Sequence, residues 1–136
     1  MTGYMALSNK DDWRTPKNLF AQLNAEFGFD LDAAASDENK LCLQWITKEQ
    51  DALSMDWEGS AIFCNPPYGR IISKWVEKAE IEHLKGKTIV VLLPARTDTK
   101  WFQTCLKYEI RFIQGTLKFD DQKYPAPFPS MIVVMK

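Results

Sequence analysis

The sequence predicts an α/β domain with a mostly parallel sheet, helices on both faces and an antiparallel pair of strands at one edge. Apolar stretches with helical spacing alternate along the chain with short β-branched runs, which is the pattern of such domains. The run from Thr88 to Leu93 is apolar on both faces, as expected of a strand in a sheet that helices cover on both sides. The 136 residues suffice for one domain and are too few for two of ordinary size.

The first half of the chain contains one clear helix and two short strand candidates. A helix is expected from residue 16 to residue 27, because Thr15 and Pro16 suit a helix start and Gly28 suits a helix end. Residues 29–33 form a strand candidate, and residues 41–47 are either a strand or irregular. Residues 61–64 form the next strand, which must end at the two prolines that follow because proline cannot donate to a sheet ladder.

The second half continues the alternation of helix and strand. Helical spacing begins at Ile72 and ends before Gly86, and the strand Thr88 to Leu93 stops at Pro94. Asp98 is expected to cap a further helix, with these side chains inward: Trp101, Phe102, Cys105 and Leu106. Residues 110–113 and 131–135 are the last strands, and we expect them to pair antiparallel at one edge, joined by the long segment 115–129.

Composition and residue types exclude several classes of protein. With 46% hydrophobic and 26% charged residues, the chain resembles an ordinary globular protein. Residues 1–12 form a polar leader without an apolar signal core, so residues 13–136 are expected to be a single domain of a cytoplasmic protein that makes no membrane contact. The one histidine and three isolated cysteines offer neither a zinc site nor a disulfide framework, so no metal is expected.

The charge is divided unequally along the chain. Residues 1–68 carry 11 acidic and 5 basic residues, whereas residues 69–136 carry 7 acidic and 12 basic ones, for a net charge of −1. A basic half is a weak pointer to a polyanionic partner, and a solvated surface without a partner fits equally well. Two acidic pairs, Asp11-Asp12 and Asp120-Asp121, are expected to be solvated turns.

Two strand ends are candidate binding sites, because ligands of open α/β sheets bind beyond the carboxyl ends of the strands. At the first, Asp32 is followed by three alanines, small residues that let a ligand approach the backbone. At the second, a strand runs directly into Asn65-Pro66-Pro67-Tyr68. The chain contains neither G-x-G-x-x-G nor G-K-[ST], which removes the usual support for a dinucleotide or a nucleoside triphosphate.

The residues from Asn65 to Tyr68 suit recognition of a planar amine. Two successive prolines stiffen the backbone, so the side-chain oxygen of Asn65 and the carbonyl of Pro66 can converge as two acceptors. The ring of Tyr68 offers a face on which a flat heterocycle can stack. The alternative is a turn that only ends the strand.

This tetrapeptide resembles the catalytic motif of S-adenosylmethionine-dependent methyltransferases that act on exocyclic or amide nitrogens. From about residue 13 to residue 135, the chain further resembles the phage and prophage DNA N-6-adenine methyltransferases. The similarity rests on an ordered set of blocks, which begin at residues 13, 31, 51, 64, 93 and 118: Trp-Arg-Thr-Pro, Leu-Asp-Ala-Ala, Asp-Ala-Leu, Cys-Asn-Pro-Pro-Tyr-Gly-Arg, Leu-Pro-Ala-Arg-Thr and Lys-Phe. The resemblance implies a Rossmann-like methyltransferase core, S-adenosylmethionine as cofactor and a location in the host-cell cytoplasm.

The resemblance also implies roles for individual residues. The catalytic set is Asn65, Pro66, Pro67 and Tyr68. The set that binds cofactor is Trp13, Thr15, Pro16, Asp32, Ala33, Ala34, Asp51 and Asn65, with Asp32 as an acidic floor and Asp51 accepting from the adenine amine of the cofactor. The chain departs from the usual pattern in two places, with alanines at 33–35 where most methyltransferases have a glycine pair, and Thr116 where an arginine is expected.

The implied partner is double-stranded DNA with an adenine flipped out of the helix, because an adenine inside a duplex is out of reach. Candidate DNA contacts are Arg70, Lys74, Arg96, Lys100, Lys118, Lys123 and Tyr124, and the segment 115–129 is expected to read sequence. Alternatives are methylation of an RNA base or a protein glutamine, or a DNA- or cofactor-binding module without turnover. A homodimer is left open, since a chain of this size has little surface with which to grip a duplex.

Overall fold

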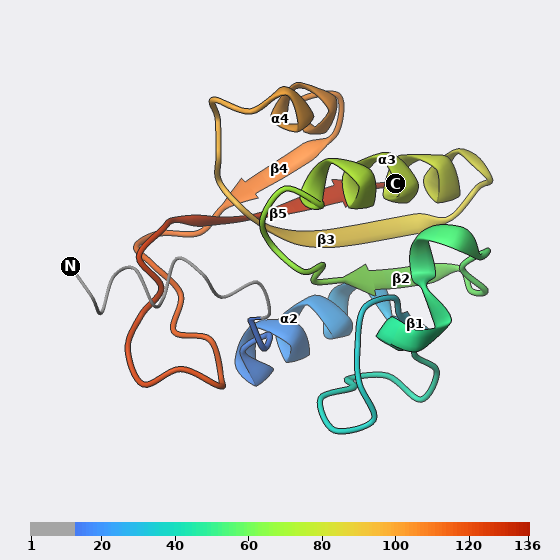
Figure 1. The fold of residues 1–136 in the computed structure, drawn as a ribbon, viewed down its shortest axis with the longest axis horizontal. Helices are drawn as coiled ribbons and strands as arrows, with labels where there is room; N and C mark the ends of the chain where they lie inside the picture. Colours follow the sequence, from blue (N-terminus) through green and yellow to red (C-terminus); the bar gives the residue numbers. More distant parts are fainter. Residues whose placement is uncertain (1–12) are drawn as a thin grey trace.

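The computed structural model describes residues 13–136, so the polar leader predicted for residues 1–12 lies outside the described residues. Within this part, five strands form a single sheet in the order β1-β2-β3-β5-β4 (Figure 1). The strands are β1 (Leu31–Asp32), β2 (Ala61–Cys64), β3 (Thr88–Pro94), β4 (Glu109–Phe112) and β5 (Ser130–Met135). The helices are α2 (Lys17–Phe27), α3 (Ile72–Leu84) and α4 (Lys100–Cys105), with short 3-10 turns at Lys48–Gln50 and Ala52–Ser54.

The sheet is mixed, so the prediction of a mostly parallel sheet holds only in part. Strands β1, β2 and β3 pair in parallel, whereas β5 pairs antiparallel with both β3 and β4. The predicted antiparallel pair at one edge is confirmed, since β4 is the edge strand and β5 its neighbour. Because β5 alone runs against the others, the connection from β4 to β5, residues 113–129, lies at the carboxyl end of β3.

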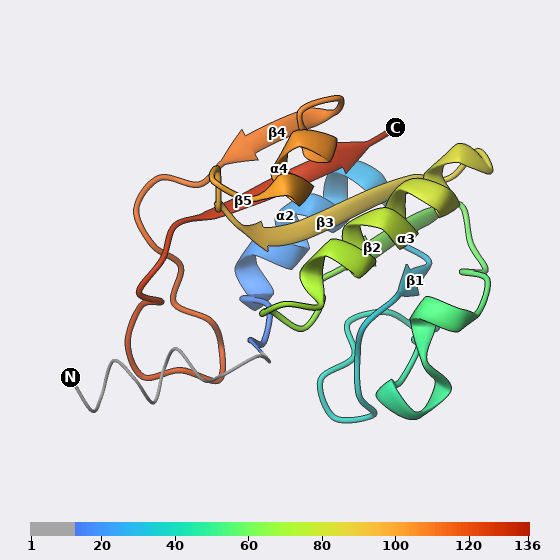
Figure 2. The same cartoon turned by 45° about the horizontal axis from the view of Figure 1, so that its top comes forward.

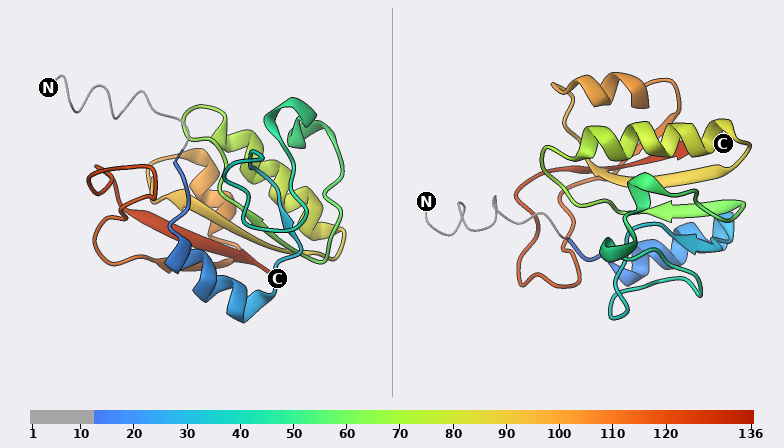
Figure 3. Two further views of the ribbon diagram at one scale, coloured as in Figure 1. Left: turned by 90° about the horizontal axis from the view of Figure 1, so that it is seen from below. Right: turned by 45° about the vertical axis from the view of Figure 1, so that its right-hand side comes forward.

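Helices cover both faces of the sheet, as the sequence predicts. Helices α3 and α4 pack against each other on one face, and α2 lies on the opposite face (Figures 2 and 3). On the α2 face, Phe20 meets Phe63 of β2 edge to face at 5.2 Å, and Phe29 packs beside them. No helix in residues 13–136 has the length and apolar content needed to cross a lipid bilayer.

The core is built from β3 and β5, whose side chains from Ile89 to Leu93 and from Met131 to Met135 are all buried. Trp57, which the sequence pattern does not place, is fully buried and donates its indole N–H to the carbonyl of Ala52. The carboxylate of Glu82 is also fully buried and is held by ion pairs with these residues: Lys78, Lys85 and Lys87. This network ties α3 to the segment that precedes β2.

Two details of the predicted α4 helix are wrong. Thr99, not Asp98, is the residue before its first turn, and it makes no side-chain cap. The Asp98 carboxylate instead lies 3.6 Å from Arg96. Leu106, expected inward, is 54% exposed because the helix ends one residue earlier, at Cys105. Residues 41–47 are irregular apart from a single bridge between Asp32 and Trp45.

Candidate active site

The two strand ends chosen from the sequence lie side by side in the structure. Strands β1 and β2 are parallel neighbours in which Asp32 is in register with Phe63. The backbone N–H of Ala33 continues this pairing by donating to the carbonyl of Phe63 at 2.9 Å. Asn65 follows two residues later and therefore points to the same face of the sheet as Phe63, which is the face that α2 covers.

The side-chain amide of Asn65 is held in one orientation by the segment that precedes α2. Its Nδ2 donates to the backbone carbonyl of Trp13 at 2.5 Å and to the hydroxyl of Thr15 at 3.0 Å. A carbonyl oxygen can only accept, so the nitrogen must face Trp13 and the oxygen must point the other way. That oxygen, Oδ1, is shielded from solvent and accepts no hydrogen bond from residues 13–136.

A buried acceptor without a donor costs free energy, so its presence calls for an explanation. At Asn65 the two hydrogen bonds donated by the nitrogen fix the orientation of the amide, and the oxygen is left without a donor among residues 13–136. The turn thus presents a fixed acceptor at the end of β2. The predicted pair of acceptors includes the carbonyl of Pro66, which belongs to a buried residue.

Asp32 is buried and its carboxylate shapes the loop after β1. Oδ1 accepts from the N–H of Ala34 at 3.3 Å, and Oδ2 accepts from that of Leu41 at 3.2 Å. Burial raises the pKa of Asp32 to about 6, and the two backbone hydrogen bonds counteract only part of that rise. Near neutral pH the site therefore holds a carboxylate that solvent stabilises poorly and that a nearby cation would stabilise.

Tyr68 is buried rather than displayed. Its ring meets Phe119 at 6.4 Å and Phe128 at 5.8 Å, both edge to face, and its hydroxyl donates to the carbonyl of Leu92 at 3.3 Å. Trp13 packs on the same two phenylalanines at 5.2 and 5.1 Å. In this arrangement no base can stack on Tyr68 until an aromatic side chain of the 113–129 connection shifts.

The other residues predicted to bind cofactor lie in two groups. Trp13 and Thr15 are buried beside Asn65, with Pro16 next to them. Asp51 is exposed, and it is the one non-glycine residue among residues 13–136 with a positive φ, at 57°. Such a conformation is uncommon and often occurs at functional sites. A pocket of about 280 Å³ lies beside it, lined by Asp37, Gln44, Trp45, Thr47 and Gln50.

The predicted DNA contacts gather at the carboxyl ends of the strands. Arg70 and Lys74 lie between β2 and the first turn of α3, and Arg96 and Lys100 lie between β3 and the first turn of α4. The remaining three, Lys118, Lys123 and Tyr124, lie on the 113–129 connection, where the Lys123 ammonium sits 5.5 Å from the Tyr124 ring. All seven side chains are exposed, so the structure brings them to the same end of the sheet as Asn65.

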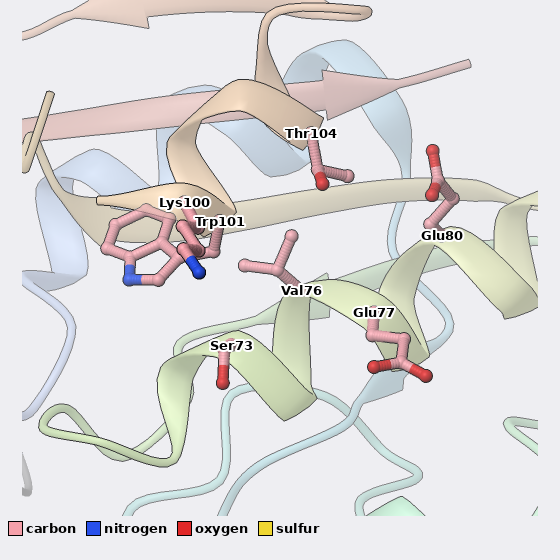
Figure 4. A pocket seen from close by; sticks show the side chains of 7 residues that line it. All are labelled: Ser73, Val76, Glu77, Glu80, Lys100, Trp101 and Thr104. Atoms are coloured by element: carbon pink, nitrogen blue, oxygen red, sulfur yellow. The ribbon is translucent and has the colours of Figure 1, made fainter. Parts of the chain in front are cut away.

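A second pocket, of about 240 Å³, lies between α3 and α4 near these cations (Figure 4). Trp101, which the sequence predicts to be in the core, is half-buried and lines this pocket with Lys100 and Ser73. Glu77 and Glu80 line its other end (Figure 4). These carboxylates make the pocket unsuitable for a polyanion along its full length.

Sequence reasoning missed Phe128 and the acidic pair at 120–121 as parts of the site. Phe128 covers Tyr68, and Asp120 and Asp121 bond to the segment before α2. The Pro-Ala-Pro-Phe-Pro run around Phe128 was a usable signal, because an aromatic residue between prolines in a long connection has few conformations to choose from.

An α/β domain with an Asn-Pro-Pro-Tyr turn at the carboxyl end of a strand has the features of the methyltransferase class. The chain belongs to the DNA N-6-adenine-methyltransferase (Dam) family, whose family model matches residues 4–135. It is 36% identical over 102 residues to the DNA N-6-adenine-methyltransferase of Haemophilus phage HP1, and the aligned region covers 74% of this chain and 59% of that protein. It is 39% identical over 118 residues to the DNA N-6-adenine-methyltransferase of Escherichia phage T1, and this aligned region covers 82% of the chain and 48% of that protein. The chain thus spans about half the length of these relatives.

Proposed function

We propose that the chain transfers a methyl group from S-adenosylmethionine to N6 of an adenine in DNA. The observation that carries this proposal is the orientation of Asn65, whose nitrogen is bound on one side and whose buried oxygen is left without a donor. An adenine amine is a planar donor with two N–H bonds. It would donate one to Oδ1 of Asn65 and the other to the carbonyl of Pro66.

The contribution of these two acceptors to catalysis is positional and electrostatic. Holding the amine in line with the methyl donor removes much of the entropic barrier to reaction. Positive charge develops on the amine nitrogen during transfer, so both hydrogen bonds strengthen as the transition state is approached. The rigid Asn65-Pro66-Pro67 backbone keeps the acceptors in place without reorganisation. The extra proton on nitrogen then leaves to solvent.

The residues near Asn65 fit the cofactor. S-adenosylmethionine supplies an electrophilic methyl on a sulfonium when it is bound. The buried Asp32 carboxylate would be stabilised by that cationic donor, and Ala33 and Ala34 leave the backbone accessible beside it. Trp13, Thr15 and Pro16, which lie beside Asn65, would line the cofactor there. The strained backbone at Asp51 and the polar pocket beside it suit the adenine end of the cofactor.

The strand order β1-β2-β3-β5-β4, with β5 antiparallel, supports a Rossmann-like methyltransferase core for this domain. The proposed DNA surface is the group of exposed cations at the carboxyl end of the sheet. Lysines and arginines that neutralise phosphates release counterions, so DNA affinity should fall steeply as salt is raised. For a phage-encoded member of this family, the reaction would take place in the host-cell cytoplasm.

Stacking of the flipped adenine on Tyr68 requires movement in the 113–129 connection. Phe119 is fully buried, whereas Phe128 is only half-buried, so Phe128 is the side chain that can swing away at lower cost. Base–aromatic stacking stabilises by about 1–3 kcal/mol per base, which would offset the lost contact between Phe128 and Tyr68.

The function is tested by incubating the protein with tritium-labelled S-adenosylmethionine and, separately, unmethylated DNA, RNA or a protein extract. Label on DNA, with N6-methyladenine identified by mass spectrometry after digestion, is the expected result. The Asn65→Ala variant should lose about 10²–10³ in turnover, as expected on removal of one preorganised polar group. Asp56→Ala is the control, since Asp56 is an exposed carboxylate whose ion-pair partner is Lys85 and which none of the proposed roles involves.

Other outcomes decide among the alternatives. If the label is found on RNA or on protein glutamine, that polymer is the substrate and DNA is not. Cofactor binding by calorimetry without methyl transfer to any polymer would indicate a binding module. Failure to bind the cofactor at millimolar concentration would refute the proposal.

A further inference from the structure

Two adjacent aspartates in the 113–129 connection hold the segment that orients Asn65. The solvated turn predicted at Asp120-Asp121 is confirmed, since both residues are exposed and lie in a turn, and their carboxylates also accept backbone hydrogen bonds. Oδ2 of Asp120 accepts from the N–H of Lys17 at 3.1 Å, and Oδ1 of Asp121 accepts from the N–H of Arg14 at 3.2 Å. The N–H of Asp120 also donates to the carbonyl of Arg14 at 3.0 Å.

Residues 13–17, here called the strap, are therefore bound along one side by the Asp120-Asp121 turn. Helix α2 begins at Lys17, and its N-cap residue Pro16 makes no side-chain cap. Asp120, which is 103 residues from Lys17 in the sequence, fills that role, because its carboxylate accepts from the Lys17 N–H at the positive end of the helix. The ring of Phe119 adds an apolar contact by packing against Trp13 at 5.2 Å.

The other side of the strap holds Asn65. The carbonyl of Trp13 and the hydroxyl of Thr15 receive both hydrogen bonds of its Nδ2. Backbone groups of two strap residues, Arg14 and Lys17, face the aspartates, whereas the carbonyl of Trp13 and the hydroxyl of Thr15 face the amide. A shift of the strap relative to the Asp120-Asp121 turn would consequently move both acceptors of the Asn65 nitrogen together.

We propose that Asp120 is a positioning residue for methyl transfer, which acts through the strap to fix the orientation of the Asn65 amide. This inference rests on the proposed function of Asn65 and extends it. The connection expected to read the DNA sequence would then also control whether the amine acceptor is aligned. Recognition and chemistry would be coupled through three backbone hydrogen bonds rather than through a contact between Asp120 and substrate.

The experiment compares Asp120→Ala with Asp120→Asn, whose side-chain oxygen can still accept from Lys17. We expect Asp120→Ala to lower kcat about ten-fold, since small misplacements of reacting groups cost much in rate. Asp120→Asn should restore most of this loss. In an Asn65→Ala background, Asp120→Ala should have no further effect on kcat, because the group through which it acts is gone. Asp56→Ala is the control for removal of a surface carboxylate.

A second measurement needs neither cofactor nor DNA. The side-chain amide protons of Asn65 are observed by NMR in the free, isotope-labelled protein, with the signals assigned by their loss in Asn65→Ala. Their exchange with solvent should be slow in the wild type and in Asp120→Asn, and at least about ten-fold faster in Asp120→Ala, because exchange requires the hydrogen bonds to open.

The inference is overturned if these protons exchange at the wild-type rate in folded Asp120→Ala, or if Asp120→Ala lowers kcat equally with and without Asn65. Thermal denaturation of each variant identifies samples that are not folded, and for these the Asp120→Asn comparison decides. Absence of adenine methylation by the wild-type protein would refute the proposed function alone, since the amide exchange is read independently of it.

Discussion

Asp32 should make the protein less stable as pH rises through 6. Burial raises its pKa from 3.8 to about 6, so between these two values the folded protein holds a proton that the unfolded chain has lost. A group of this kind contributes most to stability below its unfolded pKa, and that contribution is lost as pH rises through the folded pKa. The structure shows the cause: the residue is only 3% exposed, and within residues 13–136 its carboxylate accepts from two backbone N–H groups and from no cation.

The magnitude follows from the size of the shift. A rise of about two units corresponds to a full penalty of roughly 3 kcal/mol, of which about 2 kcal/mol develops between pH 4.5 and pH 7.5. Asp32→Asn removes the titration while keeping an oxygen that can accept one N–H. Urea denaturation of both proteins at several pH values across this range should show the variant gaining about 2 kcal/mol on the wild type.

The difference between variant and wild type is the quantity to follow, because contributions shared by the two proteins cancel in it. Asp30→Asn is the matched control, because Asp30 also accepts two backbone N–H groups, from Ser60 and Ala61, but is itself exposed. If the stability difference between wild type and Asp32→Asn stays constant from about pH 4.5 to about pH 7.5, the assignment of a buried, destabilised carboxylate at this site is wrong.

Three further substitutions test the remaining features. Gly59→Ala should destabilise by about 2 kcal/mol or more in urea denaturation, because φ is 147° and a Cβ would lie 2.4 Å from Oδ1 of Asp30; a neutral effect would contradict the geometry. Glu82→Gln should cost about 3 kcal/mol, since it leaves three lysines without their shared buried carboxylate. Hydrogen bonds from those lysines outweigh desolvation and lower the pKa of Glu82 to about 2. The stability that Glu82 provides should therefore persist above about pH 4.5 and be lost as pH falls toward about 2. If the free energy of unfolding depends on acid pH in the same way in wild type and Glu82→Gln, this reasoning is refuted. Asn65→Asp should lower the midpoint of thermal denaturation, because a carboxylate cannot donate to Trp13; an unchanged midpoint would show that the strap is held without this bond.

Local patterns predicted most of the elements because each depends on neighbours in sequence. The helix expected at 16–27 is observed at Lys17–Phe27, and the strand expected at 61–64 is observed at the same residues. The predicted α4 cap failed because Asp98 is placed one residue too early and pairs with Arg96 instead. Sequence spacing gives the residue types of a helix start but not which side chain turns toward the free N–H groups.

The candidate site shows the same division. Asn65 was identified from the stiff turn around it, and the structure adds that its nitrogen is bound by a segment 50 residues earlier in the chain. The exposed ring face predicted for Tyr68 is covered instead, by Phe119 and Phe128. No local pattern could reveal this cover, because the phenylalanines approach Tyr68 only after the connection from β4 to β5 folds back over the carboxyl end of β3.

The sequence by itself determined the α/β class, the family resemblance and the stiff turn at Asn65, because periodicity, proline geometry and motif order are local properties of the chain. Only the tertiary structure decided which way the Asn65 amide faces, that Asp32 is buried enough to titrate near pH 6, and that Asp120 caps a helix at Lys17. These properties depend on distances between residues tens of positions apart, and packing of the sheet, the strap and the 113–129 connection sets those distances.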